Sequence, residues 1–519
     1  MRLLSDRRMI HASPVILALL LACAPDAPVP PVFVRDGVVV ADDRTGRRLP
    51  DGRWLVDARW SPGESIAVAG GAAAPTTAEC VSLFHVPLGD VSRGIAGGGA
   101  APDTALAFSP DGRWLAIGSH LGELIVVDGW TGEPRWRHRM AETMVKQVAW
   151  SPDGARVYAA EQSPDAFLLA FDAVTGSERS RLRLADHVGT SAPPPGDDLY
   201  GVYTLPAAYG LQVLPGGDLL VAATHGWNDT SGVRRNRAKA LRLAPDLAIR
   251  AQWPAEGSAD AVILAMAATA DGVALSLRRS AEGPPPADLP IDGVQLLGPD
   301  LRPARAERYP PLAPWFSDTF VWNALALDGD RVVAGFGDGR IIDRSAGTDI
   351  VHGLATPIQV GGDIPIVASV GFLDLHEGRV HAVTNVTNIP WGAADPSLAP
   401  PDAHPGENAL SVLERNGDAL ALAWTWRGPH RLTGLHLSER WVVVGAGPRT
   451  DGRTDLFGAL AFEQGDEGSG AERLRAACST ESPVFFEFDV ADDGRIAVAE
   501  HPWSEGDRVL GAYRATVLR

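Results

Sequence analysis

AFSPDGRWLAIGS, residues 107–119, is an apolar run, a Ser-Pro-Asp-Gly corner and a second apolar run that ends in small residues. Asp and Gly fit the backbone conformations of tight turns, and Pro presets the approach to the corner. Two apolar runs joined by such a corner predict a β-hairpin. We therefore interpret Ser109 as a turn residue and not as a nucleophile. Trp114 is interpreted as a side chain that packs between sheets.

The same hairpin recurs along the chain. RWSPGESIAVAG (59–70) and AWSPDGARVYAAE (149–161) are close copies, and the corner serines at 61, 109 and 151 are 48 and 42 residues apart. Six weaker copies keep the order of apolar strand, Gly or Asp turn and apolar strand. They are LQVLPGGDLLVAAT (211–224), AMAATADGVALSL (265–277), NALALDGDRVVAGF (323–336), GFLDLHEGRVHAVT (371–384), GLHLSERWVVVGAG (434–447) and FEFDVADDGRIAVAE (486–500).

These nine hairpins predict an all-β fold built from repeats. Each is followed by one or two further strand candidates, and units of roughly 40–60 residues with four short strands are typical of a β-propeller. Propellers usually have about four to eight blades. We expect eight here, with seven or nine as alternatives, in a single domain over residues 32–519. The final hairpin is one strand short of a blade, and we expect an N-terminal strand in VFVRDGVVVADD (32–43) to close the ring.

Two motifs carry a family resemblance. The SPDGRWLA hairpins resemble the WD-repeat-like propellers of bacteria. The stretch from Asp128 to Trp136, DGWTGEPRW, resembles the tryptophan docking motif of quinoprotein-type propellers. Asp172, Thr175 and Gly176 repeat that turn, but Ser180 stands where the tryptophan would be. The resemblance covers the first third of the chain well and the rest only by its period.

The N-terminus has the layout of an export signal. Arg2, Arg7 and Arg8 precede the apolar run 15–22, which is shorter than the ~20 residues that span a bilayer. Leu20-Leu21-Ala22-Cys23 resembles the lipobox of bacterial lipoproteins, which implies a signal peptide over 1–22 and a lipid on Cys23. A plain secretory signal is the alternative. The Pro-rich segment 23–31 predicts a tether. We expect a lipid-anchored protein of the bacterial cell envelope, in the periplasm, on the outer membrane or at the cell surface.

Charge argues against some partners. The formal net charge is -18, and such an acidic surface repels phosphate backbones and anionic lipids. We therefore expect no nucleic acid partner, membrane contact through the lipid anchor only, and a monomer. The short basic run from Arg234 to Lys239 is interpreted as a solvated loop.

Cys80 and Cys478 remain after export, in a compartment where disulfides persist. Ring closure would bring Cys80, in the first repeat, and Cys478, in the connection entering the last, to one face near the seam. We expect a disulfide that locks the ring. Two buried free thiols are the alternative.

The candidate binding residues lie on long loops. In a propeller the turns inside each hairpin lie on one face, and the loops between second and third strands and the blade-to-blade connections lie on the other. Here the long segments fall on that second, loop-rich face, which predicts a functional surface. Four tryptophans there suit a sugar, a peptide or an aromatic ligand, and two histidines lie two residues before a tryptophan. These residues are Trp227, Trp391, Trp503, Trp315, His225 and His501. The alternative is that each tryptophan packs onto its own blade.

Motifs for catalysis are missing from the sequence. His376 and His381 are five residues apart across a hairpin turn, which does not fit the helical zinc motif, and we expect no metal site. No nucleophile elbow, phosphate loop or dinucleotide fingerprint occurs, and we expect no cofactor. The sequence therefore favours a binding or scaffold module for an envelope protein or small ligand. The alternative is an enzyme with a site in the central channel, either a quinoprotein-like oxidoreductase or a lactonase-like hydrolase.

Overall fold

A computed structural model of the chain divides it into two compact units, residues 1–58 and 59–519. In the first unit the structure describes two strand pairs, β1 (Val32–Phe33) with β2 (Val39–Val40) and β3 (Gly46–Arg48) with β4 (Trp54–Val56). In the second it describes residues 80, 82–89, 104–140, 144–191, 204–230, 233–279, 292–308, 324–336, 339–345, 348–354, 358–359, 365–387, 408–428, 430–449, 457–464, 473–505 and 508–519.

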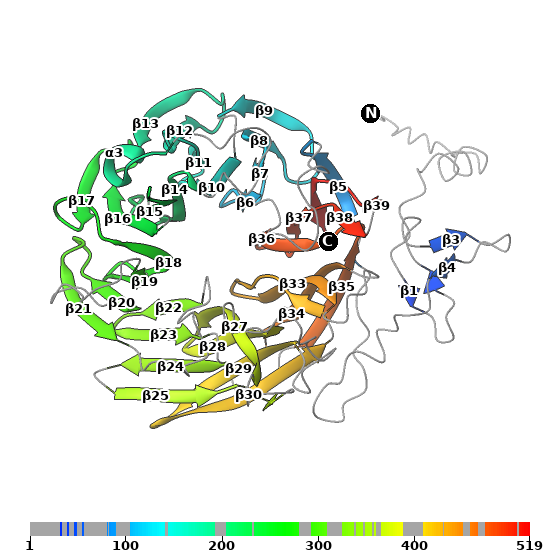
Figure 1. Ribbon diagram of the computed structural model, residues 1–519. Coiled ribbons are helices and arrows are strands. Elements are labelled where there is room, and N and C mark those ends of the chain that lie inside the picture. The colour runs from blue at the N-terminus through cyan, green and yellow to red at the C-terminus, as the bar shows by residue number, and fades with distance from the viewer. Residues whose placement is uncertain are drawn as a thin grey trace, which may run out of the picture. The chain divides into compact units, whose positions relative to one another are not determined.

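The second unit is a propeller of eight antiparallel blades arranged in a ring (Figure 1). Blades 1 to 4 each have four consecutive strands. Blade 1 is β6 (Ala105–Phe108), β7 (Trp114–Gly118), β8 (Glu123–Asp128) and β9 (Pro134–Arg139); blade 2 is β10 (Met144–Trp150), β11 (Arg156–Gln162), β12 (Phe167–Asp172) and β13 (Glu178–Arg183); blade 3 is β14 (Ala207–Val213), β15 (Leu219–Asn228), β16 (Arg234–Leu243) and β17 (Ile249–Trp253); blade 4 is β18 (Ala261–Ala268), β19 (Val273–Arg279), β20 (Asp292–Leu297) and β21 (Pro303–Arg308).

Blades 5 to 8 keep this plan with small additions. Blade 6 gains the short strand β26, and the inner strand of blade 7 is split into β31 and β32. Blade 5 is β22 (Leu325–Asp328), β23 (Arg331–Gly335), β24 (Arg340–Ser345) and β25 (Thr348–Gly353); blade 6 is β26 (Ile358–Gln359), β27 (Pro365–His376), β28 (Arg379–Thr387), β29 (Asn408–Asn416) and β30 (Ala419–Gly428); blade 7 is β31 (His430–Leu432), β32 (His436–Leu437), β33 (Trp441–Arg449), β34 (Phe457–Glu463) and β35 (Arg473–Thr480); blade 8 is β36 (Val484–Val490), β37 (Ile496–Glu500), β40 (Arg514–Leu518) and β5 (Ser82–Pro87).

Eight of the nine predicted hairpins are the first two strands of the eight blades, so the expectation of eight blades is confirmed. The ninth hairpin, 59–70, lies outside the described residues. The inner strands of blades 1 to 6 contact one another in order, β31 of blade 7 contacts β28 of blade 6, β32 of blade 7 contacts β36 of blade 8, and β36 contacts β6 of blade 1.

The strand that completes blade 8 is β5, which pairs with β40 from Ser82 opposite Leu518 to Pro87 opposite Arg514. An N-terminal strand closes the ring as expected, but the choice of residues 32–43 is wrong, because β1 and β2 pair with each other. The physical reason is packing. Val86 and Leu88 are buried in one core with Ile117 of blade 1 and Val517 of blade 8, so this segment joins the last blade to the first.

Burial explains the strand sequences. In blades 1 and 2 the second and third strands are covered on both faces by neighbouring blades, so β8 (ELIVVD) and β12 (FLLAFD) are buried along four consecutive residues. The fourth strands β9 (PRWRHR) and β13 (ERSRLR) lie at the rim and alternate between half-buried and exposed side chains. In blades 1 and 2 a continuous apolar run is therefore followed by an Arg-rich strand.

The SPDG corner is a turn in the structure. Ser109 Oγ accepts a hydrogen bond from the Trp114 N–H at 2.9 Å and donates one to Asp111 at 2.6 Å. Gly112 has a φ of +66°, a backbone conformation that side chains disfavour. Ser151 and Asp153 repeat the same bonds in blade 2. The hydroxyl groups of Ser109 and Ser151 therefore form hydrogen bonds inside their own turns.

Cys80 and Cys478 form a disulfide, with their Cα atoms 5.2 Å apart and a sequence separation of 398. Cys80 precedes β5, the outer strand of blade 8. Cys478 lies in β35, the outer strand of blade 7, and not in the connection that the sequence analysis expected. The bond thus joins blade 7 to the segment that closes the ring.

Candidate functional site

The two faces of the propeller differ in their connections. On one face, called the short-turn face, blades 1, 2 and 6 connect their first two strands through residues 109–113, 151–155 and 377–378. On the opposite, loop-rich face the connections are longer, as in 184–206 between blades 2 and 3 and 388–407 within blade 6. The loop-rich face is therefore the one with room for specific recognition.

One hairpin of blade 3 projects on the loop-rich face. Strands β15 and β16 pair over ten residue pairs, from Leu219 opposite Leu243 to Asn228 opposite Arg234. The neighbouring strand β14 pairs with β15 only as far as Thr224, and β17 pairs with β16 only from Ala240 onward. Residues 225–228 and 234–237 thus extend beyond the four-stranded part of the blade.

One face of this extension carries the group that we call the Trp227 cluster, namely His225, Trp227, Arg235 and Arg237. His225 lies opposite Arg237, and Trp227 lies opposite Arg235, so all four side chains share a face. The rings of His225 and Trp227 stack with centroids 4.7 Å apart, and the Arg237 guanidinium carbon lies 5.3 Å from the Trp227 ring. Arg235 forms an ion pair with Asp229 at 2.9 Å.

The preceding blade connection holds this cluster in place. It contains the one-turn helix α3 (Ala185–Val188). His225 is buried, and its ring nitrogens lie 2.7 Å from Ser191 Oγ and 3.2 Å from the Val188 carbonyl oxygen. These two contacts fix the imidazole on which Trp227 stacks. The sequence spacing found the His225 and Trp227 pair, but not their supports.

The basic run from Arg234 to Lys239 is a strand, not a loop. Its residues divide between two roles. Arg235 and Arg237 belong to the Trp227 cluster, whereas Lys239 is buried and its ammonium donates to the Gly257 carbonyl at 2.6 Å. Burial lowers the pKa of Lys239. On a chain with a net charge of -18, the cluster is a local basic and aromatic surface.

Of the other predicted residues, the structure describes Trp503 and His501, which lie in blade 8 and not in blade 3 with the cluster. Trp391 and Trp315 lie outside the described residues. Trp503 belongs to the hairpin of β38 (Trp503–Glu505) and β39 (Arg508–Leu510), in blade 8. His501 is buried beneath Tyr513, with ring centroids 5.4 Å apart. At this position the His501 side chain contributes to the packing of the core.

His501 and His120 lie at the seam between blades 8 and 1. Burial lowers the pKa of His501 to about 3, with a smaller contribution from the neighbouring His120 when that ring is protonated, and burial lowers the pKa of His120 to about 4. Tyr513 connects the two blades, because its hydroxyl accepts a hydrogen bond from the backbone N–H of His120 at 2.7 Å and contacts Thr104 Oγ1 at 2.8 Å. Both imidazoles are therefore neutral parts of a seam.

A second polar group, in the innermost strands, escaped the sequence analysis. Asp374, His436 and Asp489 occupy equivalent positions in blades 6, 7 and 8, where blade 1 has Ala107. Aligning the nine hairpins on their turns would have revealed this shared position. His436 Nδ1 lies 3.4 Å from Asp489, whose other carboxylate oxygen accepts the Phe108 N–H at 2.6 Å. Burial raises the pKa of Asp489. This carboxylate thus links blade 7 to blade 1 through blade 8.

Two further properties concern the described part of the chain. No group of three or more His, Cys, Asp or Glu side chains there is arranged to hold a metal ion. None of its helices is both long enough and apolar enough to cross a membrane.

Comparisons with known proteins return propellers of solved structure. The chain is similar to the C-terminal WD40 domain of Sif2, with 11% identity, a TM-score of 0.47, and coverage of 86% of this chain and 99% of that one. It is also similar to BamB from Moraxella catarrhalis, with 13% identity, a TM-score of 0.45, and coverage of 85% and 98%. No known protein family and no curated protein matches the sequence. At this level the likeness concerns the fold, which the strand order establishes independently.

Proposed function

We propose that this chain is an exported, lipid-anchored binding module of the bacterial envelope, and that it recognises a protein or envelope ligand through its loop-rich face. The difference between the two faces supports a single recognition surface. A rigid ring that carries longer loops on one side is a common platform for binding.

The observation that carries the proposal is the Trp227 cluster. Trp and Arg are the residue types that most often dominate the binding energy of interfaces. Here they are ordered before any ligand arrives, since His225 is held by Ser191 and Val188 and supports Trp227. Ordering side chains in advance reduces the entropy that binding must overcome.

Site-specific photo-crosslinking in living cells tests this surface. A benzoylphenylalanine placed at Val233, in the projecting hairpin and 40% exposed, should give a discrete crosslinked species. The matched control is Val174, which is 63% exposed in the turn between β12 and β13 on the short-turn face. Mass spectrometry then identifies what was captured at each position.

Two substitutions make the test specific. Trp227→Ala combined with Arg237→Ala should abolish the Val233 crosslink while leaving the protein folded. Trp130→Ala is the control, because Trp130 is exposed and, like Trp227, lies against an arginine, Arg495, at 4.0 Å. Equal crosslinking at 233 and 174, or a Val233 crosslink that survives the double substitution, would contradict the proposal.

The lipid anchor is tested separately. Cys23→Ser should move the protein from the membrane fraction to the soluble fraction, because the lipid has no other attachment point in the proposed lipobox. Persistence in the membrane fraction would refute the anchor without touching the binding surface.

A further inference from the structure

Arginines bridge neighbouring blades on the short-turn face. In each case an arginine of one blade donates to a turn carbonyl of the next blade. Arg495 of blade 8 bonds the Gly129 and Gly112 carbonyls of blade 1 at 2.5 and 2.6 Å. The other examples are Arg135 to Val174, Arg242 to Pro299 and Arg331 to Gly378.

At the seam between blades 1 and 2, a tryptophan supplements the bridge from Arg135 to Val174. Trp136 of blade 1 donates its indole N–H to the Ala173 carbonyl of blade 2 at 3.0 Å. Its ring covers Gly176, where a Cβ atom would come within 2.7 Å of the indole. Trp136 therefore fills the space between the two blades at the rim.

In the described part of the chain, the seam between blades 2 and 3 has neither an arginine bridge nor a tryptophan plug; here the Tyr158 hydroxyl of blade 2 donates to the Pro245 carbonyl of blade 3 at 3.2 Å. Ser180 follows Asp172 by eight residues, as Trp136 follows Asp128, and therefore takes the place of the plug. Arg156 occupies in blade 2 the position that Arg495 occupies in blade 8. The backbone carbonyl of Arg156 accepts the Ser151 N–H, and that of Arg495 accepts the Ala491 N–H, so each arginine closes the turn between the first two strands of its blade. Among the described residues no hydrogen bond from Arg156 to blade 3 is present.

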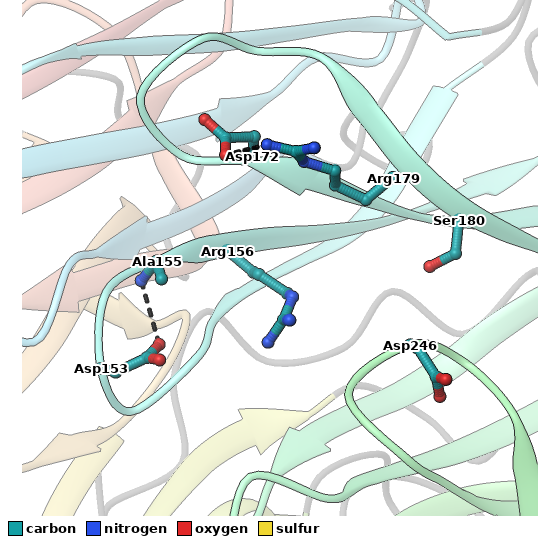
Figure 2. A pocket seen from close by; sticks show the side chains of 7 residues that line it. All are labelled: Asp153, Ala155, Arg156, Asp172, Arg179, Ser180 and Asp246. Carbon is teal, nitrogen blue, oxygen red and sulfur yellow. Dashed lines mark hydrogen bonds and ion pairs between the residues drawn. The ribbon is translucent and has the colours of Figure 1, made fainter.

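The missing groups leave a pocket of about 330 Å³, lined by Asp153, Ala155, Arg156, Asp172, Arg179, Ser180 and Asp246 (Figure 2). Leu247 of blade 3 occupies the turn position that Gly176 has in blade 2. Its side chain packs with Tyr158 in the apolar core beneath the pocket. Above it, Figure 2 shows Arg156 extending into the space between Asp153 and Asp246. Ser180 Oγ is buried without a hydrogen-bond partner among the described residues.

The lining selects the chemistry of a ligand. Three carboxylates and two guanidinium groups surround the space, and Arg179 is already paired with Asp172 at 2.6 Å. A ligand with a net charge of either sign would meet a like charge. A hydroxyl group, in contrast, can donate to Asp153 or Asp246 and accept from Arg156. The volume falls at the lower end of the range for small-molecule sites, about 300–1,000 Å³.

We propose that this pocket, on the face opposite the Trp227 cluster, binds a neutral polyhydroxylated ligand, namely one sugar unit. The sugar hydroxyls accept hydrogen bonds from Arg156, as the Gly129 and Gly112 carbonyls do from Arg495. The site is separate from the proposed recognition surface, so either proposal can fail alone.

Saturation-transfer NMR with glucose, galactose and N-acetylglucosamine tests the pocket in the intact protein. At least one of these sugars should bind saturably in the millimolar range, whereas acetate and ethylammonium should not. Ser180→Trp, which restores the plug, should abolish the signal. Arg156→Ala should weaken binding roughly tenfold through the loss of hydrogen bonds to a charged donor. Arg113→Ala, in the equivalent turn of blade 1, is the matched control and should bind normally.

Folding is monitored by the melting temperature of each variant. Ser180→Trp should melt no lower than the wild type if the indole fills the seam. If that variant is unstable, Arg156→Ala decides alone. Absence of saturable binding by all three sugars, or equal binding by the wild type and a folded Arg156→Ala variant, would overturn the proposal.

Discussion

Arg495 shows how much one side chain contributes to ring closure. Its guanidinium is buried, is paired with Asp493 at 2.8 Å, lies over the ring of Trp130 and donates to two carbonyls of blade 1. Arg495→Ala leaves these partners unsatisfied and should lower the free energy of unfolding by about 3–5 kcal/mol. Urea unfolding measures the loss. The control Arg113→Ala, in an exposed turn, should change it by less than about 0.5 kcal/mol, and a similar loss in both would contradict this role.

His501 and His120 make the stability depend on pH. Their pKa values fall to about 3 and about 4 on folding, from an unfolded value of 6.5. Below pH 6.5 the unfolded chain therefore binds two protons that the folded chain does not bind until pH 4 and below. Stability should fall with falling pH in this window, by up to about 1.4 kcal/mol per pH unit for each histidine.

Unfolding midpoints between pH 7 and pH 5 measure this dependence. His120→Leu combined with His501→Phe should flatten the profile, because both proton-binding groups are then gone from the unfolded chain. His352→Leu, on the rim strand β25, is the control. A profile that is equally steep in the double variant would show that other groups dominate.

At the scale of elements, β5 is the strand on which ring closure depends. A variant that begins at residue 59 keeps β5, whereas one that begins at residue 90 exposes the edge of β40 and removes the buried Val86 and Leu88. With the same export signal on both, the first should unfold cooperatively. The second should lose at least about 3 kcal/mol, since each buried aliphatic side chain contributes about 1.5–3 kcal/mol. Circular dichroism in urea compares them, and equal midpoints would contradict the assignment.

Strand β5 also shows which features of the fold the sequence alone could not predict. The hairpins were found because strands, turn and partner lie within about a dozen residues. The pairing of Ser82 with Leu518 has no local signal, and the strand SLFHVP reads like any half-buried strand. The two His-x-Trp patterns make the same point at the site. His225 supports Trp227 because Ser191 reaches it from the preceding blade connection, whereas His501 is covered by Tyr513. Identical spacing produced two different surroundings.

For the whole molecule, the disulfide and β5 close the ring at one place. The bond between Cys80 and Cys478 spans 398 residues, so it excludes a large part of the unfolded ensemble in which blade 7 and the closing strand are far apart. Loop-closure entropy for so long a loop predicts a stabilisation of about 2–5 kcal/mol. Because β5 follows Cys80 directly, reduction should release the closing strand first and leave blades 2 to 5 intact.

Urea unfolding with and without dithiothreitol should therefore differ by that amount in the wild type. Cys80→Ser combined with Cys478→Ser should match the reduced wild type and ignore the reductant, while Cys23→Ser should retain the full response. Hydrogen exchange adds the spatial test. On reduction, amides of β5 and β40 should lose protection while those of β11 and β15 keep it. A uniform loss would mean that the propeller opens as one cooperative unit, and no response to reductant would exclude the disulfide as the lock of the ring.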